Sequence, residues 1–295
     1  MPELPDITVY LEQLRPRVVG KPLERLDIAK PFVLRSFDPP VLEVVGKTVR
    51  GVRRMGKRIV LVMDDELFIV IHLMIAGRLR WRAPGAKQPP KGSILATFQF
   101  PNGVLVLTEA GTTRRASMHL VRGEAGLREF DRGGLEVLDA SVEEFAARLR
   151  SENHTLKRAL ADPRLFSGIG NAYSDEILHR ARLSPVMLTS RMADEDIARL
   201  FDATRATLSA WTERLRTEAG RNFPEKVTAF HEEMAVHGRF GKPCPVCGTK
   251  VQRIRYAQNE TNYCARCQTG GRLLADRALS RLLGKDWPRS IDDIE

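Results

Sequence analysis

The four cysteines of this chain, Cys244, Cys247, Cys264 and Cys267, form one cluster near its C-terminus with the pattern C-x2-C-x16-C-x2-C. Two C-x2-C pairs are typical of a zinc site, in which four thiolates surround the ion tetrahedrally at about 2.3 Å. Two disulfides are the alternative, but these form mainly in oxidising compartments, and the chain opens without the charged and then apolar leader of a secreted protein. The spacing therefore predicts one structural Zn²⁺ bound by all four cysteines.

Length and charge restrict the class of protein further. A chain of 295 residues with 43% apolar composition can bury two ordinary cores beside a small metal-bound module. Its apolar runs are all shorter than the roughly 18 to 20 residues that span a bilayer, so we expect no membrane segment. The net charge of +10 favours a nucleic-acid partner, although a solvated basic surface gives the same number.

The spacing of apolar residues changes once along the chain, from short strand-like runs to a helical pattern. A short helix over about 9–18, ended by Gly20, precedes seven β-prone runs between residues 23 and 109, separated by Gly, Pro and Asn-Gly turn signals. This spacing predicts a β-sandwich or barrel. From about Ser141 the period is helical, and the clearest helix is predicted over 193–216.

A glycine-containing loop lies between the helical blocks. Gly168 and Gly170 precede Asn171, which is a good N-cap for the helix that follows. Glycines let a backbone approach a partner, and the N–H groups at a helix N-terminus attract anions, so a DNA phosphate fits there. An ordinary helical corner is the alternative reading.

The N-terminal residues offer a nucleophile. Removal of Met1 would expose the secondary amine of Pro2, and an α-amino group titrates near 8, so a useful neutral fraction exists at physiological pH. Attack of this amine on C1′ of a deoxyribose would give a Schiff base, with Glu3 beside it to move protons. Alone, this start could also be a plain capping segment.

Five motifs in this order, PELPD at the start, Lys57 in RRMGKRIVL, HLMIAGRL, SGIGNAYSDEIL and the four-cysteine finger, resemble the formamidopyrimidine-DNA glycosylase and endonuclease VIII family. The resemblance covers residues 2 to about 270. It implies bifunctional base-excision repair, in which a damaged base is flipped out and removed, and the strand is nicked by β,δ-elimination.

The resemblance also implies roles for single residues. Pro2 would be the nucleophile, Glu3 the acid/base and Lys57, in a strand position, a catalytic or phosphate-clamping cation. The residues expected at the DNA are His72, Ile75, Arg115, Gly168, Gly170, Asn171 and Asn259.

Several positions depart from the family pattern. Asn259 stands where the finger usually carries a phosphate-gripping arginine, and Ile75 replaces the Met that fills the gap left by the flipped base. Ala116 replaces an intercalating Phe, whose stacking is worth about 1–3 kcal/mol. The stretch before the finger is short, and a tail follows Cys267. We therefore expect 8-oxoguanine opposite cytosine to be a poor substrate.

Together these features predict a multidomain α+β chain: an N-terminal β-sandwich with a flanking helix (1–135), a helical domain with a helix–two-turn–helix motif (141–240), a four-cysteine zinc ribbon (241–270) and a helical tail (271–295). The expected function is a DNA glycosylase and abasic-site lyase acting as a monomer on damaged duplex or abasic DNA, cytoplasmic and nucleoid-associated. Alternatives are a lyase-only or non-catalytic binder of altered DNA, and an RNA-binding zinc-ribbon protein.

Overall fold

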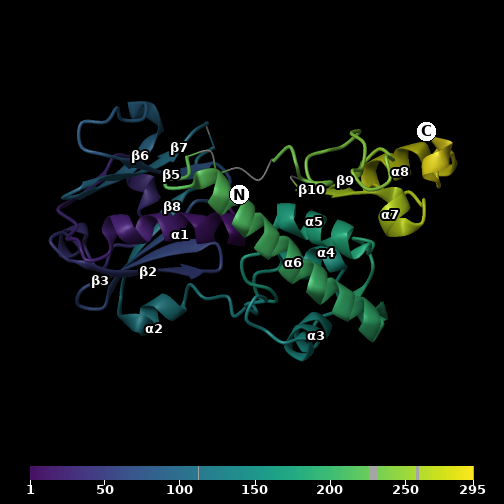
Figure 1. Ribbon diagram of the computed structural model, residues 1–295, viewed down its shortest axis with the longest axis horizontal. Helices are drawn as coiled ribbons and strands as arrows, with labels where there is room; N and C mark the ends of the chain where they lie inside the picture. Colours follow the sequence, from purple (N-terminus) through teal and green to yellow (C-terminus); the bar gives the residue numbers. More distant parts are fainter. Residues whose placement is uncertain (112, 226, 228–230, 257–258, 295) are drawn as a thin grey trace. The chain divides into compact units, whose positions relative to one another are not determined.

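The computed structural model describes residues 1–111, 113–225, 227, 231–256 and 259–294. The chain divides into two compact units: the first comprises Met1–Arg132 and Trp211–Ala229, and the second Gly133–Ala210 and Phe230–Glu295. Figure 1 shows strands predominating in the purple and blue first unit, and helices followed by a hairpin in the second. The predicted α+β class is thus confirmed, while the four domain boundaries stay predictions.

Two four-stranded antiparallel sheets build the first unit, with strand orders β1-β6-β7-β5 and β2-β3-β4-β8. The strands are β1 (Arg25–Ile28), β2 (Val49–Met55), β3 (Arg58–Met63), β4 (Leu67–His72), β5 (Gly77–Arg82), β6 (Ile94–Phe100), β7 (Gly103–Glu109) and β8 (Ser117–Arg122). The first seven match the predicted runs. Strand β8 was not predicted, although its first four residues, SMHL, alternate between polar and apolar and the apolar ones are buried.

Helix α1 (Leu4–Val18) packs into the main core of this unit, which takes apolar side chains from both sheets. Ile7, Leu11, Leu14 and Val18 repeat at spacings of three and four and are all buried, as an amphipathic helix requires. The predicted stop is confirmed, since Gly20 adopts φ +79° just after the helix. A short helix, α2 (Gly123–Arg128), follows β8.

The second unit begins with helices. These are α3 (Val142–Arg150), α4 (Leu156–Ala161), α5 (Asn171–Ala181) and the first part of α6 (Asp194–Ala219). A capping box begins α3, because Ser141 Oγ accepts from Glu144 N at 3.2 Å and Glu144 Oε2 accepts from Ser141 N at 2.8 Å. The predicted long helix over 193–216 is confirmed as α6.

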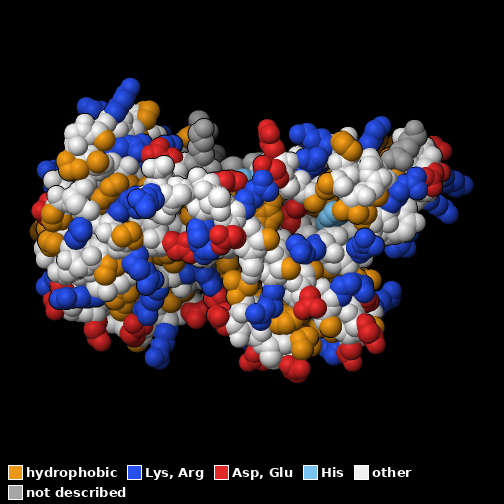
Figure 2. Space-filling view, in the orientation of Figure 1, with side chains coloured by type: hydrophobic (Ala, Val, Ile, Leu, Met, Phe, Trp, Pro, Cys, Tyr) orange, Lys and Arg blue, Asp and Glu red, His pale blue; other side chains and the backbone are white. Residues whose placement is uncertain are grey.

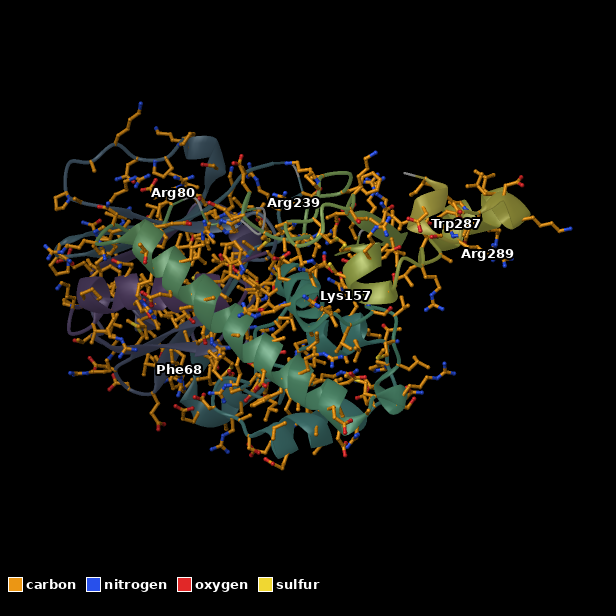
Figure 3. All side chains as sticks on the ribbon, turned by 45° about the vertical axis from the view of Figure 1, so that its right-hand side comes forward. Phe68, Arg80, Lys157, Arg239, Trp287 and Arg289 are labelled. Carbon is orange, nitrogen blue, oxygen red and sulfur yellow. The ribbon has the colours of Figure 1, made fainter. Side chains whose placement is uncertain are left out.

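The finger and the tail complete the second unit. Strands β9 (Gln252–Tyr256) and β10 (Asn259–Tyr263) form an antiparallel hairpin, followed by α7 (Ala265–Thr269) and α8 (Arg277–Leu283). After α8 the chain returns to the finger, where Ile291 is buried against Tyr263 and Leu273. Trp287 and Arg289 of this returning segment are labelled in Figure 3. The tail therefore docks on the finger and is helical only in part.

Candidate active site and zinc centre

The residues that directly follow Met1 belong to the first unit and are buried. Pro2 is buried, and Glu3 is 2% exposed at the N-cap of α1. Asp6, also 2% exposed, accepts a hydrogen bond from Glu3 N through Oδ2 at 2.8 Å. The start of the helix thus fixes the backbone of Glu3 through the side chain three residues on.

Burial and nearby charges change the protonation of this region. Burial lowers the pKa of the N-terminal amine, Glu3 and Asp6 act in the opposite direction, and Arg78 and Lys57 lower the pKa further. Burial is also the main reason that the pKa of Asp6 rises to about 7. The amine, two carboxyls and two cations are therefore close enough to interact. Glu3 and Lys57 thus both act on the amine of Met1, which precedes Pro2.

Lys57 lies in a turn, whereas the sequence analysis placed it in a strand. Gly56 and Lys57 form the two-residue connection between β2 and β3, and Met55 pairs with Arg58 across it. Gly56 has φ +59°, which a tight hairpin turn of this kind needs. Because Lys57 lies in a turn, its side chain does not follow the alternation of residues between the two faces of the sheet.

His72 ends β4 and is neutral near physiological pH. Burial, followed by Arg58 and Lys57, lowers its pKa to about 4. Its Nδ1 accepts a hydrogen bond from Met74 N at 3.2 Å, so the ring proton of the neutral form is on Nε2. His72 can therefore meet a phosphate as a neutral hydrogen-bond donor and not as a cation.

The turn after His72 presents Ile75 outward. Ile75 is 61% exposed, and its carbonyl accepts from Arg78 Nη1 at 3.0 Å. The turn closes only around a glycine, because a Cβ on Gly77 would lie 2.2 Å from the Leu73 carbonyl oxygen. The same hypothetical Cβ would be 3.0 Å from Ala116 Cβ, and Ala116 is fully buried. Ala116 consequently packs under this turn and offers no wedge at the surface, as expected from its small side chain.

Arg115 is exposed at the end of the loop before β8. Its backbone N–H donates to both carboxylate oxygens of Glu109 at 3.1 and 2.9 Å, and Ala116 N donates to Glu109 Oε2 at 3.0 Å. The buried Glu109 carboxylate thus holds the loop end by the backbone, which leaves the guanidinium of Arg115 at the surface.

The glycine-containing loop of the second unit leads directly into α5. The N-cap of α5 is Gly170, and Asn171 is the first helical residue, so the prediction of Asn171 as N-cap is wrong by one position. Gly168 has φ +78°, a conformation that favours glycine. Lys157 Nζ donates to the Asn171 carbonyl at 2.5 Å, which places a cation at this helix start (Figure 3). Gly168, Gly170 and Asn171 therefore all lie at or just before the start of α5.

The four cysteines converge in the second unit. All four are free thiols, and their sulfur atoms lie within 4.8 Å of one another. The Sγ atoms of Cys247 and Cys264 are 3.3 Å apart, and those of Cys244 and Cys267 4.0 Å. Sulfurs at about 2.3 Å from a tetrahedral ion are about 3.8 Å apart, whereas a disulfide needs about 2.05 Å. The cluster is a structural zinc site, and the disulfide alternative does not apply.

Asn259 is exposed at the start of β10. The next residue, Glu260, lies 3.4 Å from Arg253 Nη1 and 3.4 Å from Arg255 Nε. These partly exposed pairs contribute little stability, but they place a negative charge among the finger arginines. Residues 257 and 258, which precede Asn259, lie outside the described residues.

Basic side chains are distributed over the surface. On the face shown in Figure 2, Lys and Arg side chains occur on both units with acidic side chains between them. The excess of 47 Lys and Arg over 37 Asp and Glu is thus not gathered into one patch on this face.

Two residues near the amine were missed by the sequence analysis. Asp6 could have been found from its position three residues after Glu3, the spacing of a capping box. Arg78 starts the alternating run Arg78, Arg80 and Arg82 in β5, which puts three arginines on one side of a strand. Only Arg78 interacts with the amine, while Arg80 and Arg82 pair with Glu225.

Three family models match successive parts of the chain. They describe the formamidopyrimidine-DNA glycosylase N-terminal domain (residues 1–115), the formamidopyrimidine-DNA glycosylase H2TH domain (135–219) and a zinc finger found in FPG and IleRS (241–270). Among the described residues, no helix is both long and apolar enough to cross a membrane.

Relatives of known name resemble the chain along most of its length. A formamidopyrimidine-DNA glycosylase from Heliobacterium modesticaldum is 30% identical over 280 residues, which covers 91% of this chain and 100% of the relative. One from Pelotomaculum thermopropionicum is 30% identical over 279 residues, with 91% and 99% covered. A Lactococcus lactis FPG mutant in complex with Fapy-dG-containing DNA is similar in structure, with 25% identity, a TM-score of 0.79 and coverage of 91% of this chain and all of that one.

Proposed function

Since the chain belongs to the formamidopyrimidine-DNA glycosylase family, we propose that it is a base-excision repair enzyme that removes damaged bases from DNA and then nicks the abasic strand. The observation that carries this proposal is the environment of the N-terminus. The amine of Met1, one residue before Pro2, is buried and has a lowered pKa, and the charges of Glu3, Asp6, Arg78 and Lys57 act on it. A capping box accounts for the two carboxyls, but it does not account for the two cations that act on the same amine.

The chemistry assigned to Pro2 follows from this environment. After removal of Met1, the Pro2 nitrogen would attack C1′ as the bond from C1′ to the base breaks, and loss of the ring oxygen from C1′ would give an iminium Schiff base. The buried surroundings that lower the pKa of the Met1 amine would act on the Pro2 amine once Met1 is removed, and a lowered pKa would increase the neutral, nucleophilic fraction of that amine at physiological pH. Glu3 is assigned the proton transfers at the sugar, and Lys57 the stabilisation of a nearby phosphate.

The remaining predicted residues are assigned to holding the DNA. Ile75 suits the space left by a flipped base because it is apolar and exposed. His72 would donate a neutral hydrogen bond, Arg115 would pair with a phosphate, and the start of α5 at Gly168, Gly170 and Asn171 would bind another. Asn259 would add an uncharged contact from the finger. We propose that the enzyme acts as a monomer in the cytoplasm, at the nucleoid.

A test should separate base removal from strand nicking. Glu3→Gln should slow excision of a damaged base by about 100-fold or more, since a positioned acid/base contributes about that factor, and should affect nicking of a preformed abasic duplex less. Arg180→Gln, a change at an exposed position of α5, serves as the control. Equal rates for Glu3→Gln and the native chain on damaged bases would remove the role assigned to Glu3.

A lyase-only or non-catalytic binder is the second candidate. It is favoured by the buried Ala116 and by the pair Asn259 and Glu260, because these positions lack an aromatic wedge and add a negative charge to the finger. We propose that 8-oxoguanine opposite cytosine is a poor substrate, and that abasic, single-stranded, oxidised-pyrimidine or bulkier lesions are better. A panel of lesion duplexes at one salt concentration tests this. Activity on no member, abasic DNA included, would favour the binder.

A further inference from the structure

Helix α5 directs one row of polar side chains to the finger. Asn171, Asp175 and His179 are spaced by four residues and so lie along one side of the helix. At the start of the row, Asn171 Nδ2 donates to the Glu260 carbonyl in β10 at 3.0 Å. In the middle, Asn262 Nδ2 lies 3.4 Å from Asp175 Oδ2. Both contacts join α5 to strand β10 of the zinc-bound hairpin.

The third member of the row reaches the zinc site itself. His179 Nε2 is 3.2 Å from Cys244 Sγ, and the two residues are 6% and 2% exposed. A zinc-bound thiolate carries no proton and can only accept, so the ring nitrogen must be the donor of this bond. Hydrogen bonds from outside the ligand set orient metal ligands and usually change metal affinity or activity by 10- to 100-fold when they are lost.

A second contact of α5 fixes the segment that leads into the finger. The carboxylate of Glu176 accepts from Ala235 N at 2.7 Å and from Val236 N and His237 N at 2.9 Å each. Cys244 follows this segment by seven residues. Glu176 thus fixes the segment that precedes Cys244, while His179 contacts the sulfur of Cys244 itself.

We infer that His179 is a positioning residue of the zinc site: its Nε2–H donates to the Cys244 thiolate, stabilises that thiolate against loss of the ion and fastens the finger to α5. The same helix begins at Asn171, so retention of zinc and the position of the helix start are linked through one rigid element. His179 does not ligate the ion. This inference does not depend on which lesion the enzyme cuts.

The test compares zinc release from full-length, zinc-loaded variants. His179→Phe removes the donor and keeps a ring, whereas His179→Gln keeps an N–H at a similar distance from the backbone; Arg180→Gln is the neighbouring control. Release into excess EDTA, followed with a metal-sensitive dye, should be roughly tenfold faster for His179→Phe and within about twofold of native for the other two. Should His179→Phe not fold, as judged by its thermal transition, the smaller His179→Leu replaces it.

Replacing zinc with cobalt allows an absorption measurement that a simple loss of packing would not change. A hydrogen bond lowers the energy of a sulfur lone pair, so the sulfur-to-cobalt charge-transfer band should shift to lower energy in His179→Phe and stay in place in His179→Gln. Native release rates and an unshifted band in folded His179→Phe would overturn the inference. Equal acceleration of zinc release in the Phe and Gln variants would also overturn it, because packing and not the hydrogen bond would then be the cause.

Discussion

The buried carboxyl of Asp6 gives the clearest pH dependence. Its pKa rises to about 7 from an ordinary value of 3.8, chiefly because burial disfavours the charged form. Between these two pH values the folded protein keeps a proton that the unfolded chain has released. Stability therefore falls as the pH rises, by about 1.4 kcal/mol per pH unit, and the fall ends near pH 7 after about 4 kcal/mol in total.

Asp6→Asn should remove this dependence. The amide has no charge to bury, and its oxygen can still accept the hydrogen bond from Glu3 N, so the start of α1 is kept. The difference in unfolding free energy, variant minus native, should grow by roughly 2 kcal/mol between pH 5 and pH 7, because the carboxyl is already half ionised in the folded protein at pH 7, and then level off. Urea unfolding followed by circular dichroism at pH 5, 6, 7 and 8 measures it.

The control for Asp6→Asn is Asp139→Asn, an exposed carboxyl on the second unit. It should change the unfolding free energy by a similar amount at every pH. The reasoning is refuted if the native and Asp6→Asn curves run parallel from pH 5 to pH 7, because the Asp6 carboxyl would then ionise as easily in the folded protein as in the unfolded chain.

Two further predictions concern the finger. Removing zinc with a chelator should increase hydrogen exchange of the amides in β9 and β10 and in the cluster of Tyr263, Leu273 and Ile291 that the tail forms on the finger. The amides of β3 and β4 in the other unit should stay protected. Unchanged exchange at the finger would refute a structural role for the metal. Asn259→Arg should tighten binding to an abasic duplex and make the slope of log K against log salt steeper by about 0.9, the value for one added phosphate contact. Asn259→Gln is its uncharged control, and an unchanged slope for the Arg variant would remove Asn259 from the DNA interface.

The regular elements were predictable because their signals are local. The β-prone runs between turn signals predicted the strands β1 to β7, and the three-and-four spacing of apolar residues predicted α1 and α6. Lys57 was placed in a strand because it begins the β-prone run KRIVLVM, yet Gly56 and Lys57 form the two-residue turn between β2 and β3. Boundaries of this kind depend on which strands pair, and pairing is not a local property.

The sequence indicated which residue types form the site, but it did not indicate how deeply they are buried or which residues they contact. Pro2 and Glu3 are visible in the sequence, but the raised pKa of Asp6 arises from burial by residues far along the chain. His179 could not be connected to Cys244 from the sequence, since 65 residues separate them and only the fold brings the ring to the sulfur. Contacts between residues far apart in the sequence thus determine which polar side chains have a shifted pKa or lie beside the zinc site.

The most direct test of the proposed reaction is capture of the Schiff base. The native chain is incubated with abasic duplex DNA and sodium borohydride, and the reduced adduct is digested and located by mass spectrometry. The account predicts a covalent adduct on the nitrogen of Pro2, with Met1 absent, and no such adduct when Met1 is retained. An adduct on Lys57 or another lysine, or no adduct with an abasic duplex that the protein binds, would contradict the assignment of Pro2 as the nucleophile.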